Sequence, residues 1–224
     1  MSFDDLKSSN GVIKMSTADR REREKEQRRN DIIDAAEKLF FSRGYESVTM
    51  DDVANEVELA RGTLYLYFKN KDDIYLAIAT RGAKIFNHML SECCHGEQTG
   101  FERAKSLFST FCQFYKSYPG YYLANWYSQM PRYNEADLSA MDELTRIRSD
   151  NFHVVAAAIR EGVQDGTVRD DVDPTKTTLV WMSSLQGVFN ITPAVEMHMQ
   201  INRVEHEELI EYVMSLMLRS VENR

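Results

Sequence analysis

The sequence is poor in residues that break helices, and it lacks the features of secreted or membrane-spanning chains. Ten glycines and four prolines are few for 224 residues. No series of short alternating apolar segments separated by turn dipeptides is present, which excludes a β-sandwich or a β-barrel. No apolar run approaches the roughly 20 residues needed to cross a bilayer, and the N-terminus lacks a secretory signal. We therefore expect a helical, cytoplasmic protein with no membrane partner.

Cysteine and catalytic motifs are scarce as well. Cys93, Cys94 and Cys112 make an odd number without framework spacing, so we expect free thiols and no disulfide framework. The run Cys93-Cys94-His95, with His88 nearby, is a poor metal site because adjacent cysteines rarely bind one metal together. The chain has no Gly-rich phosphate loop, no HExxH pair and no nucleophile elbow. We therefore assign no cofactor, no metal site and no catalytic residue.

Basic residues are outnumbered, yet the deficit is uneven along the chain. The formal net charge is −8, whereas a nucleic-acid-binding protein usually presents a basic surface. Residues 19–85 carry 13 Lys and Arg against 14 Asp and Glu, and residues 86–224 carry 12 against 19. Most of the excess acid therefore belongs to the C-terminal part, and the N-terminal part remains compatible with a DNA partner.

The N-terminal third contains the spacing of a helix-turn-helix. After a flexible arm over residues 1–18, apolar residues at helical spacing and a glycine at position 44 predict a helix over residues 20–43. Thr49 can cap a second helix by accepting from the backbone of Asp52. A three-residue connection leads into residues 61–68, and a long helix follows from Lys71. Two short helices across a tight turn, flanked by longer ones, indicate a helix-turn-helix.

These residues resemble a known family. Residues 49–76, TMDDVANEVELARGTLYLYFKNKDDIYL, are similar to the DNA-binding segment of the tetracycline-repressor (TetR) family, including the Gly-Thr-Leu-Tyr-x-Tyr-Phe core and the lysine three residues later. Residues 30–44 also fit the family, and residues 159–174 resemble its loop between the seventh and eighth helices. The resemblance implies a DNA-binding transcriptional regulator with a helical C-terminal ligand-binding and dimerisation domain.

The resemblance also assigns roles within this segment. Tyr67 and Lys71 match positions that bind the DNA backbone, which sets the register without reading sequence. Arg61 and Tyr65 lie on the recognition helix, where arginine pairs with guanine, and Gly62 allows a close approach to DNA. The predicted DNA-binding residues are Thr49, Arg61, Gly62, Thr63, Tyr65, Tyr67 and Lys71.

Two positions of the turn depart from the family pattern. Glu58 stands where the family often has glycine, and a left-handed conformation there would cost about 1–2 kcal/mol. Ala60 stands where serine often caps the recognition helix, and alanine cannot accept the capping hydrogen bond. The fold tolerates these costs, but phosphate contacts at the turn are weakened.

Beyond the helix-turn-helix we expect only helices. Breaks at glycine and proline separate the segments 71–94, 101–118, 121–130, 136–163, 175–190 and 204–221. The predicted architecture is all-α with about nine helices. It comprises the arm, a DNA-binding domain over residues 19–75, and a ligand-binding and dimerisation domain over residues 76–224.

Large, soft side chains on the central helices form a candidate ligand site, because small-molecule pockets are mainly apolar with a few polar groups. Such stripes are also common in ordinary helical cores, so the alternative for each residue is packing alone. The candidates are Phe111, Phe114, Tyr115, Tyr122, Trp126, Met130, Phe152 and Trp181, with Gln186 among the polar groups.

The last two predicted helices favour a homodimer. Leu179 and Leu185 on one helix, and Tyr212 and Leu216 on the other, belong to apolar stripes that serve either a two-fold interface or the core of one chain. A dimer suits a palindromic operator in double-stranded DNA. We expect a repressor released by a small, largely apolar ligand. The alternatives are a constitutive dimeric DNA-binding protein and an all-helical enzyme.

Overall fold

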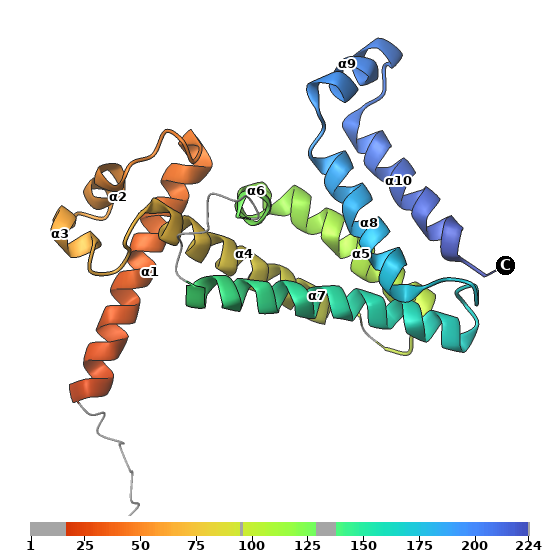
Figure 1. The fold of residues 1–224 in the computed structure, drawn as a ribbon, viewed down its shortest axis with the longest axis horizontal. Helices are drawn as coiled ribbons and strands as arrows, with labels where there is room; N and C mark the ends of the chain where they lie inside the picture. The colour runs from red at the N-terminus through yellow and green to blue at the C-terminus, as the bar shows by residue number, and fades with distance from the viewer. Residues whose placement is uncertain (1–16, 95, 129–137, 224) are drawn as a thin grey trace, which may run out of the picture. The chain divides into compact units, whose positions relative to one another are not determined.

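The computed structural model describes residues 17–94, 96–128 and 138–223, and every named element within them is a helix (Figure 1). An isolated β-bridge joins Val168 to Glu222. The all-α prediction is confirmed, with one helix more than the nine expected. The helices are α1 (Thr17–Arg43), α2 (Met50–Glu56), α3 (Arg61–Leu64), α4 (Lys71–Glu92), α5 (Gly100–Ser117), α6 (Pro119–Tyr127), α7 (Leu138–Asp165), α8 (Pro174–Phe189), α9 (Pro193–Asn202) and α10 (His206–Val221).

Two compact units divide the chain between Lys71 and Asp72. In the first unit, the early turns of α1 are exposed and its later turns bury an apolar face that includes Ile32 and Phe40. Gly44 ends this helix with a positive φ of 78°, and its N–H donates to the Phe40 carbonyl over 2.9 Å. Glycine adopts this conformation without the steric penalty of a Cβ, which is why α1 stops here.

In the second unit, α5 and α7 cross with their backbones in close contact at two glycines. A Cβ built on Gly100 would lie 1.9 Å from the Gly162 nitrogen, so only glycine permits this crossing. The Gly100 N–H donates to Asp165 Oδ2 over 2.7 Å, and this bond lowers the pKa of the Asp165 carboxyl. The first residue of α5 is thereby held against the last residue of α7.

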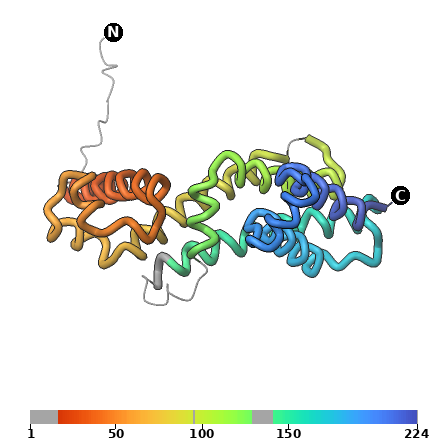
Figure 2. The backbone as a smooth tube through the Cα atoms, turned by 90° about the horizontal axis from the view of Figure 1, so that it is seen from above, coloured from red at the N-terminus to blue at the C-terminus, as the bar shows by residue number. Residues whose placement is uncertain are grey.

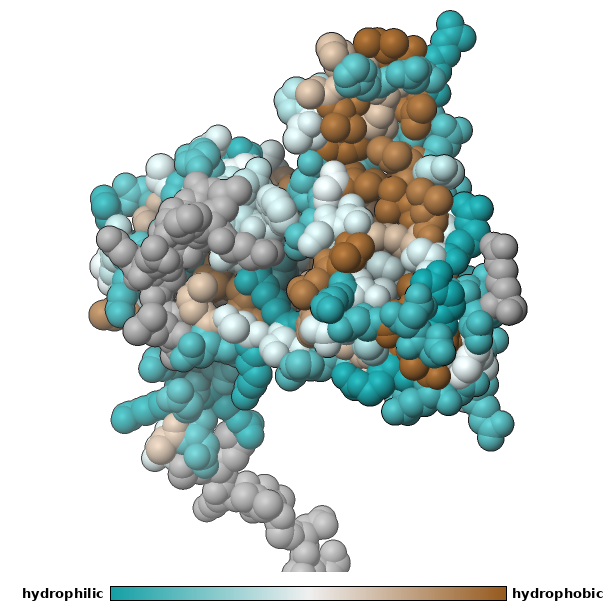
Figure 3. All heavy atoms as spheres, turned by 45° about the vertical axis from the view of Figure 1, so that its right-hand side comes forward, coloured by the Kyte–Doolittle hydropathy of each residue, from teal (hydrophilic) through white to brown (hydrophobic). Residues whose placement is uncertain are grey.

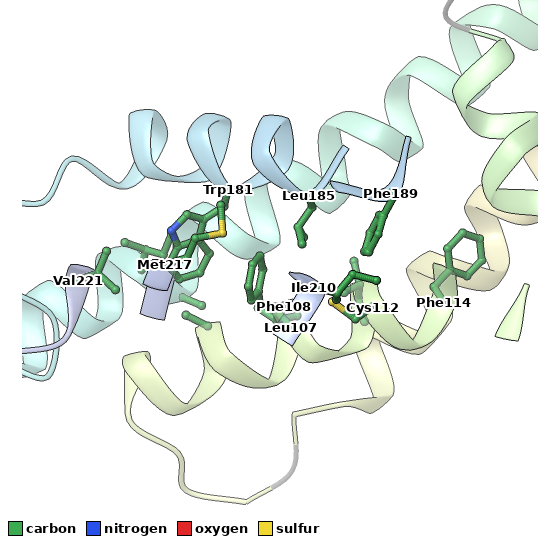
Figure 4. Packing of buried hydrophobic residues seen from close by; sticks show 14 of the residues in the cluster. Leu107, Phe108, Cys112, Phe114, Trp181, Leu185, Phe189, Ile210, Met217 and Val221 are labelled. Carbon is green, nitrogen blue, oxygen red and sulfur yellow. The ribbon is translucent and has the colours of Figure 1, made fainter. Parts of the chain in front are cut away.

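The core of the second unit contains buried residues from α4 to α8 and from α10. Phe108 of α5 packs against Trp181 of α8 with ring centroids 4.9 Å apart (Figure 4). Leu185 and Phe189 continue the α8 face, and Ile210 of α10 belongs to the same cluster. Burial of these apolar side chains is the main source of stability for this unit.

The chain returns on itself at α8 and α10, which lie side by side (Figure 2). The end of α10 is tied to the loop between α7 and α8, where Arg169 N–H donates to the Val221 carbonyl over 2.9 Å. A second bond runs from Asn223 N–H to the Thr167 carbonyl over 3.0 Å. The C-terminal helix is therefore part of the folded unit along its whole length.

The sequence prediction missed α9. Thr192 caps this helix by accepting from Val195 N–H, and Pro193 occupies its first turn. A similar arrangement, in which the capping residue Asp173 is followed by Pro174, correctly predicted the start of α8. No residue of α9 is buried, and its cap was not recognised as the start of a helix.

Other boundaries differ from those predicted. Helix α1 begins at Thr17, so the predicted arm is shorter by two residues, and residues 1–16 lie outside the described part of the chain. Helix α6 ends at Tyr127, and the candidate ligand residue Met130 lies outside the described residues. None of the described helices combines the length and apolar character needed to cross a membrane.

Candidate DNA-binding surface and ligand pocket

The turn between α2 and α3 closes on Glu58. This residue has a φ of 55°, so it adopts the left-handed conformation whose cost was considered above. Its N–H donates to the Asn55 carbonyl over 3.2 Å, and the next N–H, of Leu59, donates to the Ala54 carbonyl over 2.9 Å. These two bonds form the Schellman arrangement that satisfies the last carbonyls of a helix. The turn is therefore well formed although it lacks glycine.

The start of α2 is fixed by the predicted cap. Thr49 Oγ1 accepts from Asp52 N–H over 3.2 Å, and Asp52 Oδ2 accepts from Thr49 N–H over 2.8 Å. These bonds with Thr49 lower the pKa of the exposed Asp52 carboxyl, because a hydrogen-bonded carboxylate resists protonation. Thr49 thus serves the fold, and its exposed position also leaves it available to a partner.

Helix α3 is shorter than predicted, because regular α-helix covers only Arg61–Leu64. Ala60 precedes it without a side-chain cap, as expected for alanine. The chain continues through tight turns, in which Tyr67 N–H donates to the Leu64 carbonyl over 3.0 Å. Leu64 and Phe68 are buried and anchor the segment, so the intervening residues form its outward face.

That outward face carries most of the predicted DNA-binding residues. Arg61, Gly62 and Tyr65 are exposed, and Thr63 is half-buried. Leu66 is 80% exposed, and the sequence analysis overlooked it because an apolar residue in a helix is usually buried. An exposed aliphatic side chain on a recognition segment can contact a thymine methyl group. No side chain fills the space beside Gly62, where a Cβ would meet nothing within 4 Å.

Arg61 is already engaged on this surface. Its Nη1 donates to Asp51 Oδ2 over 3.1 Å, and its Nη2 lies 3.5 Å from the Tyr65 hydroxyl. Contact with Tyr65 and Asp51 raises the pKa of the guanidinium, so Arg61 stays charged. Since the ion pair is exposed, it is weak and can exchange for another acceptor.

Lys71, which the family resemblance assigns to the DNA backbone, also has a structural role. It is half-buried, and its ammonium donates to the carbonyls of Tyr45 and Val48 over 3.1 and 3.2 Å. The same group lies 4.2 Å from the centroid of the Tyr45 ring. Lys71 therefore holds the loop between α1 and α2, whatever else it binds. Tyr67 is half-buried as well.

In the second unit, a cavity of about 140 Å³ opens among α4, α5, α6, α7 and α8. Five of the predicted ligand residues line it, from three helices. Its lining consists of Ala83, Phe86, Phe111, Phe114, Tyr122, Asn125, Trp126, Arg148, Asn151, Met182 and Gln186.

A smaller cavity of about 40 Å³ shares Phe86, Phe111, Asn151 and Met182 with the first. Two further predicted residues, Phe152 and Trp181, line this second space. Tyr115 is among the lining residues of neither cavity. Its ring stacks on Phe189 with centroids 4.0 Å apart and meets Tyr122 edge-on. The structure therefore gathers seven of the nine candidates around two adjoining spaces.

The large cavity has a polar wall that the sequence analysis did not find. Arg148 Nη2 donates to the Asn125 carbonyl and to Ser128 Oγ, over 2.5 and 2.7 Å. Asn151 is buried, and its Oδ1 accepts from Asn87 over 2.7 Å. Burial lowers the pKa of the Arg148 guanidinium to about 10. A charged run such as Asp142–Asp150 is usually a solvated helix face, so sequence alone gave no sign that Arg148 points inward.

The exposed sides of α8 and α10 carry apolar residues, and Figure 3 shows apolar side chains gathered over the part formed by α8, α9 and α10. Leu179, Val180, Tyr212 and Leu216 are each at least 46% exposed. Leu185, which we assigned to the same stripe, is buried in the core instead. Only part of the predicted stripe is therefore available to a partner.

Comparison with known proteins adds a family match. Residues 32–78 match the family model described as bacterial regulatory proteins, tetR family. A fatty acid metabolism regulator protein from Bacillus subtilis is 24% identical over 142 residues, which cover 63% of this chain and 71% of that protein. The transcriptional regulator HbdR from an Aromatoleum species is 47% identical over 49 residues, which cover 22% of this chain and 21% of HbdR.

Solved structures share the fold over most of the chain. A tetR-family regulatory protein from Rhodococcus superposes with a TM-score of 0.68 at 17% identity, over 88% of this chain and 98% of that one. The regulator FadR from Bacillus subtilis, solved with stearoyl-CoA, gives a TM-score of 0.61 at 19% identity, over 84% of this chain and 96% of FadR. At such identities the likeness concerns the fold alone.

Proposed function

This chain belongs to the TetR family of bacterial transcriptional regulators, and from that premise we propose that it is a ligand-released repressor. It binds a palindromic operator as a homodimer and dissociates when a small, largely apolar molecule enters the cavity of the second unit. The observation that carries the proposal is the combination of an outward recognition segment with a cavity that touches α4, the helix that starts at Lys71.

The DNA-binding half of the proposal rests on the outward face of residues 61–67. Arg61 is charged and exposed, and arginine paired with guanine is the commonest specific contact in the major groove. Tyr67 and Lys71 bind phosphates and set the register. Lys71 can serve both its loop and a phosphate, because an ammonium has three donors and two of them are used by carbonyls.

The ligand-binding half rests on the cavity lined by Phe111, Phe114 and Trp126. An apolar cavity of about 150 Å³ binds benzene in another protein, so a cavity of about 140 Å³ suits a molecule of similar size. FadR, whose structure holds stearoyl-CoA, shares the fold. An acyl chain as long as stearoyl requires the helices around this cavity to move apart.

Dimerisation rests on the exposed apolar residues of α8 and α10. Leu179, Val180, Tyr212 and Leu216 lie outside the core, and Ser183 and Gly187 between them are small enough for two helices to approach closely. Two helices from each subunit would form a four-helix bundle. A two-fold axis places two recognition segments on two half-sites of the operator.

Ligand and DNA are coupled through α4 in this proposal. Ala83 and Phe86 bring α4 to the cavity wall, and its first residue, Lys71, belongs to the DNA-binding unit. A ligand that favours one arrangement of α4 changes the separation of the two recognition segments. Operator DNA requires a separation of about 34–36 Å or a multiple, so differential affinity for the two arrangements produces release.

The DNA assignment is tested by titrating variants against an operator selected from genomic fragments and against a scrambled duplex. Tyr67→Phe should lower the affinity for the operator and for the scrambled duplex by the same factor, because a phosphate contact carries no sequence information. Arg61→Ala should reduce the free energy of operator binding by about 1–3 kcal/mol and relax the sequence preference at one base pair. Normal operator affinity in the double variant Tyr67→Phe/Lys71→Met, with its fold intact, would refute this surface.

The release half is tested separately. Mass spectrometry of small molecules retained by the purified protein identifies candidates, which are then added to the protein–operator complex. Trp126→Ala should impair release more than operator affinity, since Trp126 lines the cavity and lies outside the DNA-binding unit. Operator affinity unaffected by every retained molecule would support a constitutive DNA-binding protein instead.

A further inference from the structure

The guanidinium of Arg148 is the one charged group among the lining residues of the large cavity, and the proposed function leaves its chemistry unused. Its contacts within the described residues are with Asn125 and Ser128, and all are to neutral oxygens. No carboxylate of the described chain contributes to its pKa, which burial alone lowers. A half-buried cation that has no counter-ion among the described residues is uncommon, because buried charges are normally paired.

The contacts of Arg148 leave donors available. All three bonds use Nη2, whereas a guanidinium has five N–H donors in a planar fork. With a pKa of about 10, the group remains charged at neutral pH. A carboxylate is the acceptor that matches this fork in both charge and geometry.

The rest of the cavity restricts what such a carboxylate can be attached to. Phe86, Phe111 and Trp126 supply aromatic surface, and Met182 adds a flexible apolar side chain. These residues offer no partner to a second charge. The volume of about 140 Å³ admits roughly one ring or a short chain, by comparison with a cavity of about 150 Å³ that binds benzene.

We propose that this cavity binds a small apolar monocarboxylic acid in its ionised form, with the carboxylate on Arg148 and the hydrocarbon part against Phe86, Phe111 and Trp126. The inference rests on the proposed function only in taking this cavity as the ligand site. Neutral molecules of the same shape fill the apolar part but leave the guanidinium without an anion. The site therefore selects acids over their amides and alcohols.

The test measures binding to the full-length protein without DNA, by isothermal titration calorimetry at pH 7.5. The probes are benzoate, phenylacetate and hexanoate, each paired with its amide. At least one acid should bind about tenfold more tightly than its amide, because a charge-assisted bond is roughly twice as strong as a neutral one. Equal affinities within all three pairs, or no binding of any probe, would overturn the proposal.

Variants then test whether Arg148 causes the preference for acids over amides. Arg148→Gln should reduce the ratio of acid to amide affinity to about one while changing amide affinity less than threefold. Arg148→Lys should keep part of the preference, and it also serves if the glutamine variant does not fold. Arg146→Gln, at an exposed position of the same helix, is the matched control and should behave like wild type. A preference that survives Arg148→Gln contradicts the assignment.

Because no DNA is present, this outcome is independent of operator binding and release. A protein that prefers acids but shows no release from DNA retains the ligand inference and loses the proposed mechanism. A protein that is released by a neutral molecule and ignores acids gives the reverse result.

Discussion

Neighbouring positions of the recognition segment, residues 61–67, differ in the contacts that they already make within the protein. Arg61 is held by Asp51, whereas the space beside Gly62 is open on the protein side. In the proposed complex with DNA, Arg61 exchanges Asp51 for an acceptor on the DNA, and Gly62 lets the backbone come close because it has no side chain.

Gly62→Ala separates the requirements of the fold from those of DNA. The added Cβ meets no atom within 4 Å, so the free energy of unfolding should stay the same or rise by about 0.5–1 kcal/mol. Operator affinity should fall about tenfold if the segment approaches DNA at this point. Thermal melting and a DNA titration check the two effects, and unchanged DNA affinity would place Gly62 away from the groove.

Asp51→Asn should strengthen DNA binding. The substitution frees Arg61 from its 3.1 Å partner and removes an anion that repels phosphate. We expect a gain of about threefold to tenfold at low salt that diminishes as salt rises. Glu56→Gln is the matched control, because it removes the same charge from α2 without touching Arg61. An equal gain in both variants would mean that the release of Arg61 contributes nothing.

Among the helices, the crossing of α5 and α7 tolerates least change. Gly100 and Gly162 bring the two backbones together, and Arg103 of α5 pairs with Glu161 of α7 over 2.5 Å at the same place. Both helices also line the cavity proposed to bind the ligand. A shift at the crossing is therefore transmitted to the cavity walls, since packed interiors have little free volume to absorb it.

Gly100→Ala should destabilise the protein by about 3 kcal/mol or more. Its Cβ would lie 1.9 Å from the Gly162 nitrogen and 2.3 Å from the Gly162 Cα, and backbone atoms cannot rotate away as a side chain can. Urea unfolding measures the loss. Gly62→Ala is the control, since it makes the same chemical change where the space is open. Equal stability of the two variants would contradict the close crossing.

At the scale of the whole molecule, the proposed regulation requires a second copy of the chain. The apolar residues on the outer sides of α8 and α10 have no partner in the core, and several exceed 45% exposure. Exposed apolar areas of this kind usually mark an interface. The proposed dimer buries them and aligns two recognition segments with one palindrome.

Leu216→Glu should therefore weaken the dimer about 100-fold. Each dimer would bury two unpaired carboxylates, at about 1–3 kcal/mol each. Sedimentation measures the dissociation constant, and operator affinity should fall with it. Leu123→Glu, at a position of similar exposure on α6, is the control and should remain dimeric. Dimers of normal stability in Leu216→Glu would place the interface elsewhere.

The sequence by itself determined the elements whose signals are local. Three helix ends were predicted correctly from neighbouring residues: the start of α2 from Thr49 and Asp52, the end of α1 from Gly44, and the start of α8 from Asp173 and Pro174. Capping depends on a few neighbouring residues and therefore survives any tertiary arrangement. The order of helices around residues 49–76 followed from the same local signals, whereas the family followed from the resemblance of these residues to a known sequence pattern. Helix α9 was missed although Thr192 and Pro193 supply a cap of the same kind as that of α8.

Only the tertiary structure decided which side chains face inward. Arg148 lies on the cavity wall and Leu66 is exposed, although a charged residue and a leucine predict the opposite. Lys71 is held by carbonyls from 26 and 23 positions earlier in the chain. Burial and such distant contacts arise from the packing of several helices at once, and the spacing of residues along one helix does not encode the position of its neighbours.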